Sequence, residues 1–462
     1  MKKMLKNENV VMSYPSKAIQ RFYLSNGASS LPEVSHGEGI YLWDTNGARY
    51  IDASSGPVVN NIGHANRRVI AAMTRQAERV AYASRAHFEN APNRELAEKV
   101  TALAGDGFDQ AYVVSGGSEA IEAAIKLAKQ YAEAIGQPDR SIVLARNPSY
   151  HGATLGAAAV TGDAMSRKLF ADLMNPQPLV PAPFTYRVPY NFSPESYARH
   201  CAQAIADEVE RVGGDKVLAF LMEPVGGLAT GALVAPDIYY GEVRKICDRY
   251  GILLIFDEVM SGAGRTGAFL AAHHWPDCRP DIVVLAKGVA AGYTPLGIVL
   301  APDRIVEPVV NGGGFSHGHT YAANPLSCAV ASEVISVLEE DELIANAEAV
   351  GRHLKAGLWG VAEECPIIGD VRGKGLLMAV ELVQDQETKS IFPADANVIG
   401  RTVAIGMQEG LALYARRTSG GVFGEWLMIS PPLITSRSQA EELCDRLGRT
   451  LKRVSEEMVS YL

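Results

Sequence analysis

The stretch Gly251-Ile252-Leu253-Leu254-Ile255-Phe256-Asp257-Glu258 runs through five apolar residues and ends on two carboxylates. A run of this length without polar positions favours a strand that is buried on both faces of a sheet. A second such run, residues 282–286, ends on Lys287. Because ligands of open α/β sheets bind outside the carboxyl ends of the strands, Asp257 and Lys287 are expected at the ligand-binding edge of one sheet.

Helices and short apolar strands alternate on both sides of these two runs. Strands are predicted over residues 111–114, 141–145 and 217–222, and amphipathic helices over residues 118–135 and 238–250. Apolar strands separated by helices are typical of parallel strands whose sheet is covered on both faces. The centre of the chain is therefore predicted to be an α/β domain.

The two ends of the chain follow other patterns. The first 35 residues are mixed in pattern and are interpreted as an arm or a short helix, whereas residues 39–44 and 48–52 flank an Asn46-Gly47 turn and predict a hairpin. After residue 326, a long helix, a strand pair within residues 371–382 and a C-terminal helix predict a smaller α+β domain. The expected division is an N-terminal segment that contributes to the small domain, a large domain and a C-terminal small domain: residues 1–60, 61–325 and 326–462.

The composition fits a large globular protein without disulfide or metal staples. The chain has 462 residues, of which 47% are hydrophobic and 21% charged, with a net charge of -9. This charge and the absence of a basic run argue against nucleic acid or anionic membrane as a partner. Six cysteines without a C-x-x-C pair argue against a zinc site. Because residues 1–21 lack the apolar region of a secretory signal, we expect a cytoplasmic protein.

A small-residue motif, Ser115-Gly116-Gly117-Ser118-Glu119, lies between a predicted strand and a predicted helix. Small side chains let the backbone N–H groups of Gly117 and Ser118 approach a phosphate at the positive end of the helix. The alternative is an ordinary helix start, in which Ser118 caps the first turn and Glu119 is favourable for the helix dipole.

The charged groups at the two strand ends have functional and structural explanations. A buried Asp257 needs a cationic partner, which a pyridinium nitrogen could supply; the alternatives are a helix cap or an ion pair with Arg265. Lys287 at a strand end could form a Schiff base with a carbonyl cofactor, and the alternative is a lysine that reaches out to solvent. The combination of both with the small-residue motif is more specific than any one of them.

Seven motifs stand in the order found in one known family. They are Ser115-Gly116-Gly117-Ser118-Glu119-Ala120, Tyr150-His151-Gly152, Glu223-Pro224-Val225, Asp257-Glu258-Val259, Gly264-Arg265-Thr266-Gly267, Lys287-Gly288, and His319-Thr320-Tyr321 with Asn324-Pro325. With them the chain resembles the class III, pyridoxal-phosphate-dependent aminotransferases of fold type I, from about residue 37 to residue 433. The stretch Gly314-Phe315-Ser316-His317-Gly318 is similar to the amine:pyruvate, or omega, branch.

The resemblance implies a fold and an activity. The fold would be α/β, with a large domain whose mixed, mostly parallel sheet is flanked by helices and a smaller α+β domain. The activity would be transfer of an amino group from an amine or omega-amino acid to pyruvate or a similar keto acid, by a ping-pong mechanism through the pyridoxamine form. A decarboxylase or racemase on the same scaffold is the alternative enzyme, and a cofactor-free binding protein is the alternative class. The implied assembly is a homodimer with shared active sites, or a tetramer.

The resemblance also implies residue roles. Lys287 would hold pyridoxal phosphate as an internal aldimine and then act as the acid and base. Asp257 would keep the pyridine nitrogen protonated. The phosphate would be bound by Gly117 and Ser118, and by Thr320 of the second subunit.

Other residues of the implied cofactor site surround the ring. Tyr150 would stack on one face and also line the substrate space, and Val259 would pack against the other face. Glu223 is expected near Asp257, and His151 belongs to the same cofactor-binding set.

The substrate-binding residues are where the chain departs from the family. Val58 aligns with a position that is aromatic in many amine:pyruvate enzymes, so it would widen the pocket or lose an aromatic wall. The family places a movable arginine before Pro431-Pro432-Leu433, and here Arg416 or Arg417 could take that role. The alternative is that both are surface cations that balance a negative chain.

Two weaker motifs are not expected to be functional sites. Residues 262–267 match G-x-G-x-x-G, but residues 257–261 separate them from their strand, which a dinucleotide site does not allow. The pairs His273-His274 and His317-x-His319 lack companion metal ligands, so we expect no metal site.

Overall fold

A central sheet of seven strands organises the computed structural model, which describes residues 31–461. In spatial order its strands are β4 (Gln110–Val114), β10 (Gly297–Ala301), β9 (Ile282–Ala286), β8 (Leu253–Asp257), β7 (Val217–Met222), β5 (Ile142–Asn147) and β6 (Leu179–Pro181). The five neighbouring strands β6, β5, β7, β8 and β9 are mutually parallel. Strand β10 pairs antiparallel with both β9 and β4. The expected mixed, mostly parallel sheet is confirmed.

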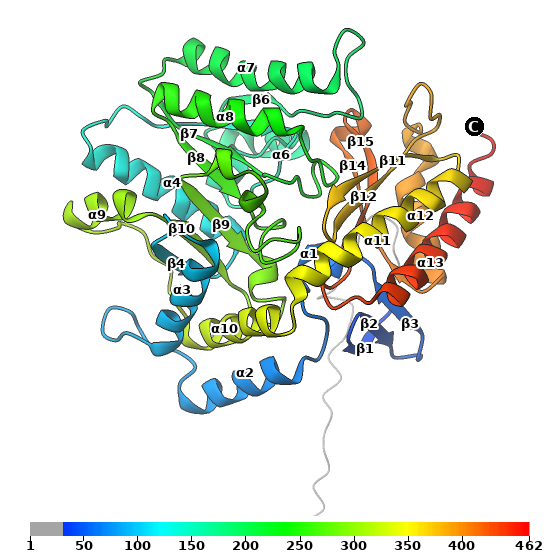
Figure 1. The fold of residues 1–462 in the computed structure, drawn as a ribbon, viewed down its shortest axis with the longest axis horizontal. Coiled ribbons are helices and arrows are strands. Elements are labelled where there is room, and N and C mark those ends of the chain that lie inside the picture. Colours follow the sequence, from blue (N-terminus) through cyan, green and yellow to red (C-terminus); the bar gives the residue numbers. More distant parts are fainter. Residues whose placement is uncertain (1–30, 462) are drawn as a thin grey trace, which may run out of the picture.

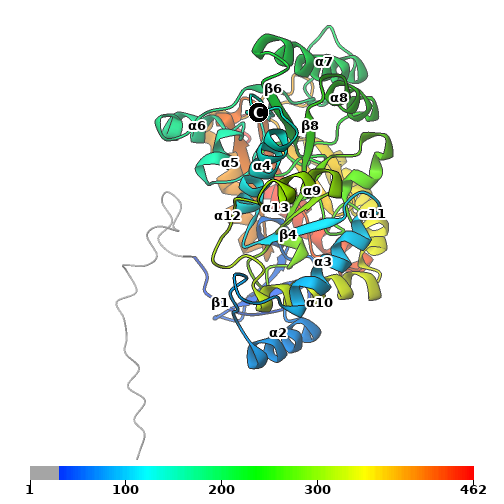
Figure 2. The same cartoon turned by 90° about the vertical axis from the view of Figure 1, so that its left-hand side faces the viewer.

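Helices cover both faces of this sheet because its strands are apolar on both faces. Along β8, Leu253 and Ile255 belong to the core beneath α4 (Gly117–Ala134), whereas Leu254 and Phe256 belong to the larger core on the opposite face. Further helices of this part are α2 (Arg67–Arg79), α3 (Ala91–Ala104), α5 (Leu155–Ala159), α6 (Ala164–Phe170), α7 (Pro194–Val212), α8 (Asp237–Tyr250), α9 (Asp303–Asn311) and α10 (Pro325–Glu340). Figures 1 and 2 show α7 beside α8 at one end and α2 beside α10 at the other.

A second layered unit lies to the right of the central sheet in Figure 1. Its antiparallel sheet has the order β11 (Ile368–Lys374), β12 (Leu377–Leu382), β15 (Gly424–Ile429) and β14 (Tyr414–Thr418). Its helices are α11 (Leu343–Glu364), α12 (Val398–Gln408) and α13 (Arg437–Glu457). Short 3-10 helices complete the fold: η1 (Ala171–Leu173), η2 (Ala271–His274), η3 (Pro276–Cys278), η4 (Lys287–Val289), η5 (Ala394–Ala396) and η6 (Ser419–Gly421).

The N-terminal hairpin forms as expected and joins the C-terminal part of the chain. Strands β1 (Val34–Glu38), β2 (Tyr41–Asp44) and β3 (Arg49–Asp52) are antiparallel, and β3 pairs in parallel with β13 (Leu411–Ala412). The predicted arm or helix lies largely outside the described residues. The proposed domain limits remain a prediction.

Two sequence-based expectations bear on the class of protein. The sequence argues against disulfide staples, and in the structure all six cysteines are buried and free. Between residues 31 and 461, no helix combines the length and the apolar character that crossing a membrane requires.

Candidate active site

Asp257 and Lys287 lie at the ends of adjacent parallel strands and line one cavity of about 620 Å³. This volume is in the range of cavities that bind small molecules and cofactors. Most of the other predicted cofactor residues line the same cavity, namely Gly117, Ser118, Tyr150, His151, Glu223 and Val259. The chain therefore brings together residues that are up to 170 positions apart in the sequence, from Gly117 to Lys287.

The small-residue motif forms the start of α4 and leaves it without a side-chain cap. Gly116 is the N-cap residue. The hydroxyl of Ser118 accepts a hydrogen bond of 3.0 Å from the N–H of Ala153 instead of capping the helix, so the capping alternative is wrong. The carboxylate of Glu119 accepts from the N–H of Ser115 at 2.9 Å. The first N–H groups of the helix are thus available to an anion in the cavity.

Glycine at position 117 keeps this end of the cavity open. A Cβ atom there would lie 3.1 Å from Cγ1 of Val259, closer than ordinary van der Waals contact. Val259 is fixed by its own N–H, which donates to Oδ1 of Asp257 at 3.0 Å. The start of α4 and the residue after the Asp257-Glu258 pair are therefore closely packed against each other.

The carboxylate of Asp257 is 4% exposed and pairs with a histidine. Nδ1 of His151 lies 2.8 Å from Oδ2 of Asp257, and Nε2 of the same ring is buried without a partner. The predicted alternative pairing with Arg265 is wrong, because that guanidinium donates to the carbonyl of Pro431 and to the side chain of Asn61. Each carboxylate oxygen of Asp257 thus has one partner, and the residue also lines the cavity.

Glu223 adds a second carboxylate beside Asp257. Burial raises its pKa, and the neighbouring His151 and Arg146 oppose that increase. Oε1 accepts from the N–H of Gly227 at 3.2 Å, whereas Oε2 has no hydrogen-bond partner and lies 3.9 Å from Arg146. The unpartnered oxygen of Glu223 and ring nitrogen of His151 are polar groups that suit a polar ligand.

Lys287 begins η4 with a positive φ of 46°. Burial lowers the pKa of its ammonium group to about 8, and the carboxylates of Asp257 and Glu223 limit this decrease. A lysine with this pKa exists partly as the neutral amine near pH 8, the form that attacks a carbonyl. The residue is thus suited to covalent chemistry with an aldehyde.

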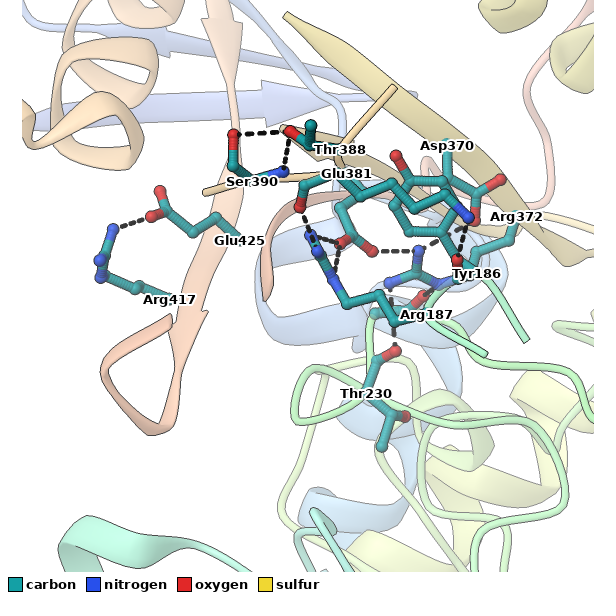
Figure 3. Close-up of polar contacts among 12 residues, drawn as sticks. Tyr186, Arg187, Thr230, Asp370, Arg372, Glu381, Thr388, Ser390, Arg417 and Glu425 are labelled. Atoms are coloured by element: carbon teal, nitrogen blue, oxygen red, sulfur yellow. Dashed lines mark hydrogen bonds and ion pairs between the residues drawn. The ribbon is translucent and has the colours of Figure 1, made fainter. Parts of the chain in front are cut away.

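The two candidate arginines point in different directions because they are neighbours on strand β14. Arg416 lines the cavity beside Tyr414 and forms an ion pair with Asp163. Arg417 is paired with Glu425 and donates to the carbonyls of Phe392 and Gly420 at 3.0 and 3.1 Å. Figure 3 shows the Arg417–Glu425 pair at some distance from the polar cluster around Glu381. The structure brings Arg416, and not Arg417, to the cavity.

Two further predicted site residues do not line the cavity. Val58 is 1% exposed, has a φ of 60° and packs into the core, whereas its neighbours Pro57 and Val59 line the cavity. The turn α1 (Ser55–Val58) directs the valine side chain into the core. The alternating side-chain directions of an extended loop do not predict this orientation. Thr320 lies in the segment before α10 and is absent from the cavity wall of this single chain.

Several lining residues were not identified from the sequence. They include Tyr414 on β14, Leu228 and Met260, and no local motif marks them. The pairing of Tyr414 with Met428 on β15 places it. Such contacts between distant segments carry no signal in a single sequence.

The pair His273-His274 has ordinary backbone partners, whereas Nε2 of His317 in the other pair is buried without a hydrogen-bond partner. His273 and His274 contact the carbonyl oxygens of Ala104 and Thr266, each at 3.1 Å. No group of three or more metal-ligating side chains occurs in the part of the chain that the structure describes.

The cavity suits pyridoxal phosphate. An uncapped helix start can hold the phosphate, a buried aspartate can hold a protonated ring nitrogen, and a lysine with a lowered pKa can bind the aldehyde carbon. The unpartnered His151 and Glu223 atoms supply polar contacts for the rest of the ring.

Comparisons with known proteins agree with this geometry. A family model described as aminotransferase class-III matches residues 23–451. An uncharacterised aminotransferase of Bacillus subtilis is 37% identical over 93% of this chain and 97% of its own length. A putrescine–pyruvate aminotransferase of Pseudomonas aeruginosa is 32% identical over 89% of this chain and 88% of its own. The crystal structure of an amine transaminase from an uncultivated Pseudomonas species, in a pyridoxal-phosphate-bound form, superposes with a TM-score of 0.87 at 33% identity, covering 94% of this chain and 98% of that one.

Proposed function

The chain belongs to the class-III aminotransferase family, whose cofactor is pyridoxal phosphate, and from this premise we propose that it moves an amino group from an amine or omega-amino acid to pyruvate or a similar keto acid. The observation that carries the proposal is a cavity that joins the cofactor residues to apolar walls and to one arginine, Arg416. The similarity to a putrescine–pyruvate aminotransferase and to an amine transaminase supports the same assignment. No observation favours the decarboxylase or racemase alternative.

Lys287 and Asp257 are proposed to carry the chemistry. When bound, pyridoxal phosphate supplies an electron sink and carries the amino group between two half-reactions. Nζ of Lys287 would hold the cofactor covalently at rest and, once released, move a proton on the substrate side of the ring. The carboxylate of Asp257, oriented by His151 and by the N–H of Val259, would hold a proton on the ring nitrogen.

Five further residues are proposed to bind and orient the cofactor. The N–H groups of Gly117 and Ser118 would bind the phosphate at the start of α4. Tyr150, which is 43% exposed at the cavity, would stack on one face of the ring, and Val259 would pack on the other. Glu223 would face the ring edge beside Asp257.

The substrate space would serve the amine and the keto acid in turn. Apolar side chains such as Pro57, Val59 and Leu228 line it and can cover a hydrocarbon chain. Arg416 is the cavity arginine that could pair with the carboxylate of a keto acid. Because both substrates use one space, a ping-pong order follows, in which the first product leaves before the keto acid binds.

The proposed assembly is a homodimer, or a tetramer made of two such dimers. Tyr82, Phe88 and Tyr321 expose 46%, 67% and 62% of their surface, which is unusual for aromatic side chains. Thr320 precedes Tyr321 in the same segment, so an interface over these aromatics would carry Thr320 to the second subunit. There it would complete the phosphate site.

A donor panel tests the proposed function. The loaded enzyme is incubated with pyruvate and one donor at a time: putrescine, other carboxylate-free amines, omega-amino acids and ordinary α-amino acids. We expect alanine to form with members of the first three groups. Release of carbon dioxide, or racemisation of an amino acid without alanine formation, would contradict the proposal.

A further inference from the structure

The carboxylate of Asp163 belongs neither to the seven sequence motifs nor to the residues that line the cavity. Asp163 is the N-cap residue of α6, it is 6% exposed, and it follows the loop that carries Tyr150 and His151. Its Oδ1 atom is paired with Nη2 of Arg416, which lies 253 positions away in the sequence. The proposed carboxylate-binding arginine is therefore already bound to a carboxylate of the protein.

The aspartate is the fixed partner of this pair. Its Oδ2 atom accepts hydrogen bonds from the N–H and the hydroxyl of Ser166, at 3.1 and 2.8 Å. These bonds hold the carboxylate by the first turn of α6, independently of Arg416. The guanidinium, at the end of a long side chain that is 25% exposed, is the partner that can move.

Arg416 has few contacts that would keep it in place. Within residues 31–461, its guanidinium makes no hydrogen bond or ion pair other than the one with Asp163. Arg417, by contrast, is held by Glu425 and by two backbone carbonyls. Of the two neighbours, Arg416 can change partner at the cost of a single charged contact.

We propose that Asp163 is a specificity-determining residue, an internal carboxylate that competes with the substrate carboxylate for Arg416. This inference rests on the proposed function, in which Arg416 receives the keto acid. With a carboxylate-free amine in the cavity, Arg416 stays paired with Asp163, and neither this partly buried cation nor the buried carboxylate is left without a partner. A keto acid must break or share that pair, so Asp163 weakens carboxylate binding and favours release of the acid product.

The competition predicts that removing the negative charge strengthens carboxylate binding. Asparagine is as favourable as aspartate at the N-cap position and has a similar shape, so α6 should form as before in Asp163→Asn. Because a charged hydrogen bond no longer has to be broken, we expect the Kd of a carboxylate to fall by on the order of tenfold. Asp163→Ser, also a good N-cap residue, should change the Kd in the same direction.

The test uses the full chain loaded with pyridoxal phosphate and propionate as the probe, because propionate has a carboxylate but no amine or carbonyl group. Calorimetry gives its Kd for the wild type, Asp163→Asn, Arg416→Ala and the double variant. We expect Asp163→Asn to lower the Kd only when Arg416 is present. Ser166→Ala, which removes a hydroxyl contact of Asp163 but leaves its charge, is the matched control and should leave the Kd unchanged.

The outcomes separate this inference from the proposed function. A Kd for propionate that is unchanged or higher in Asp163→Asn, or one that falls equally without Arg416, would overturn the competition. If the wild type forms alanine from amines and pyruvate in that case, the proposed function stands alone. If no amine supports alanine formation while the Arg416-dependent effect is seen, the proposed function fails and the competition for carboxylates stands.

Discussion

Lys287 and Asp257 each stand at the carboxyl end of a buried strand, and this position places both at the cavity. Each follows a run of five apolar residues, and each lies at the cavity in the structure. The sequence could predict this because β8 and β9 are apolar on both faces and their carboxyl ends meet at one edge. Which group pairs with Asp257 could not be predicted, because His151 is 106 positions away.

The lowered pKa of Lys287 predicts how cofactor loading depends on pH. Below about pH 8 the lysine is mostly protonated and cannot attack the cofactor carbonyl. We expect the rate of covalent loading to rise about tenfold per pH unit up to pH 8 and then to level off. Stopped-flow absorbance of the cofactor-free enzyme mixed with pyridoxal phosphate measures it. A rate that keeps rising to pH 10, as for an ordinary lysine, would contradict the assignment, and Lys287→Ala should show no covalent product after borohydride reduction.

Arg416 and Arg417 give a matched pair of substitutions. Arg416→Ala should weaken pyruvate use by about 1.5–3 kcal/mol, through the loss of charged hydrogen bonds, and spare a carboxylate-free amine. Arg417→Ala should lower stability instead, by about 3–5 kcal/mol, because it leaves the 1% exposed Glu425 without its cation. KM for pyruvate and the free energy of unfolding are measured for both. If Arg417→Ala alone raised KM, the assignment of Arg416 would fail.

Strand β14 shows why the sequence left these two arginines undecided. An extended segment predicts that adjacent side chains point in opposite directions, and the structure agrees. The choice depends on register: Arg417 stands opposite Glu425 on β15, and Arg416 stands opposite Trp426. Register between strands is set by packing over the whole sheet and is not visible in the segment itself. The same limit applies to β10, whose antiparallel place between β4 and β9 was not predicted.

The contact between the loop at Gly152 and the start of α4 should be sensitive to one added methyl group. Gly152 has a φ of 141°, and a Cβ atom there would lie 2.6 Å from the hydroxyl oxygen of Ser118. Gly152→Ala should lower stability by about 1–3 kcal/mol and weaken cofactor binding by displacing Ser118. Gly241→Ala in α8, where a Cβ atom meets nothing within 4 Å, is the control and should raise stability by up to about 1 kcal/mol.

Calorimetric unfolding and the Kd of pyridoxal phosphate measure both glycine variants. Equal stability and equal cofactor affinity in Gly152→Ala and the wild type would show that the loop and helix are not tightly coupled.

For the whole molecule, the central question is assembly. The exposed aromatic residues Tyr82, Phe88 and Tyr321 and the absence of Thr320 from the cavity wall of the single chain lead us to expect a homodimer. Sedimentation of the loaded enzyme should give at least twice the 49.5 kDa mass of the chain. Thr320→Ala should weaken phosphate binding without dissociating the dimer. A fully active monomer at assay concentration would contradict the shared site.

The overall layout of the molecule was largely visible in the sequence, and the substrate side of the site was not. Apolar strands, the Asn46-Gly47 hairpin and the ordered motifs indicated the α/β fold and many of the residues that line the cavity. The walls contributed by Pro57, Val59 and Tyr414 depend on a tight turn with positive φ and on strand register. These walls form only when the N-terminal turn and strand β14 are packed against the central sheet.

The most direct test of the central claim is a pair of stoichiometric half-reactions. The loaded enzyme is mixed with an excess of a carboxylate-free amine that supports alanine formation in the donor panel, without keto acid, and the visible absorbance of the bound cofactor is followed. We predict that the absorbance disappears as one carbonyl product forms per active site, and that it returns on addition of pyruvate as one alanine forms. Absorbance that persists with the amine, or that returns without pyruvate, would contradict the account.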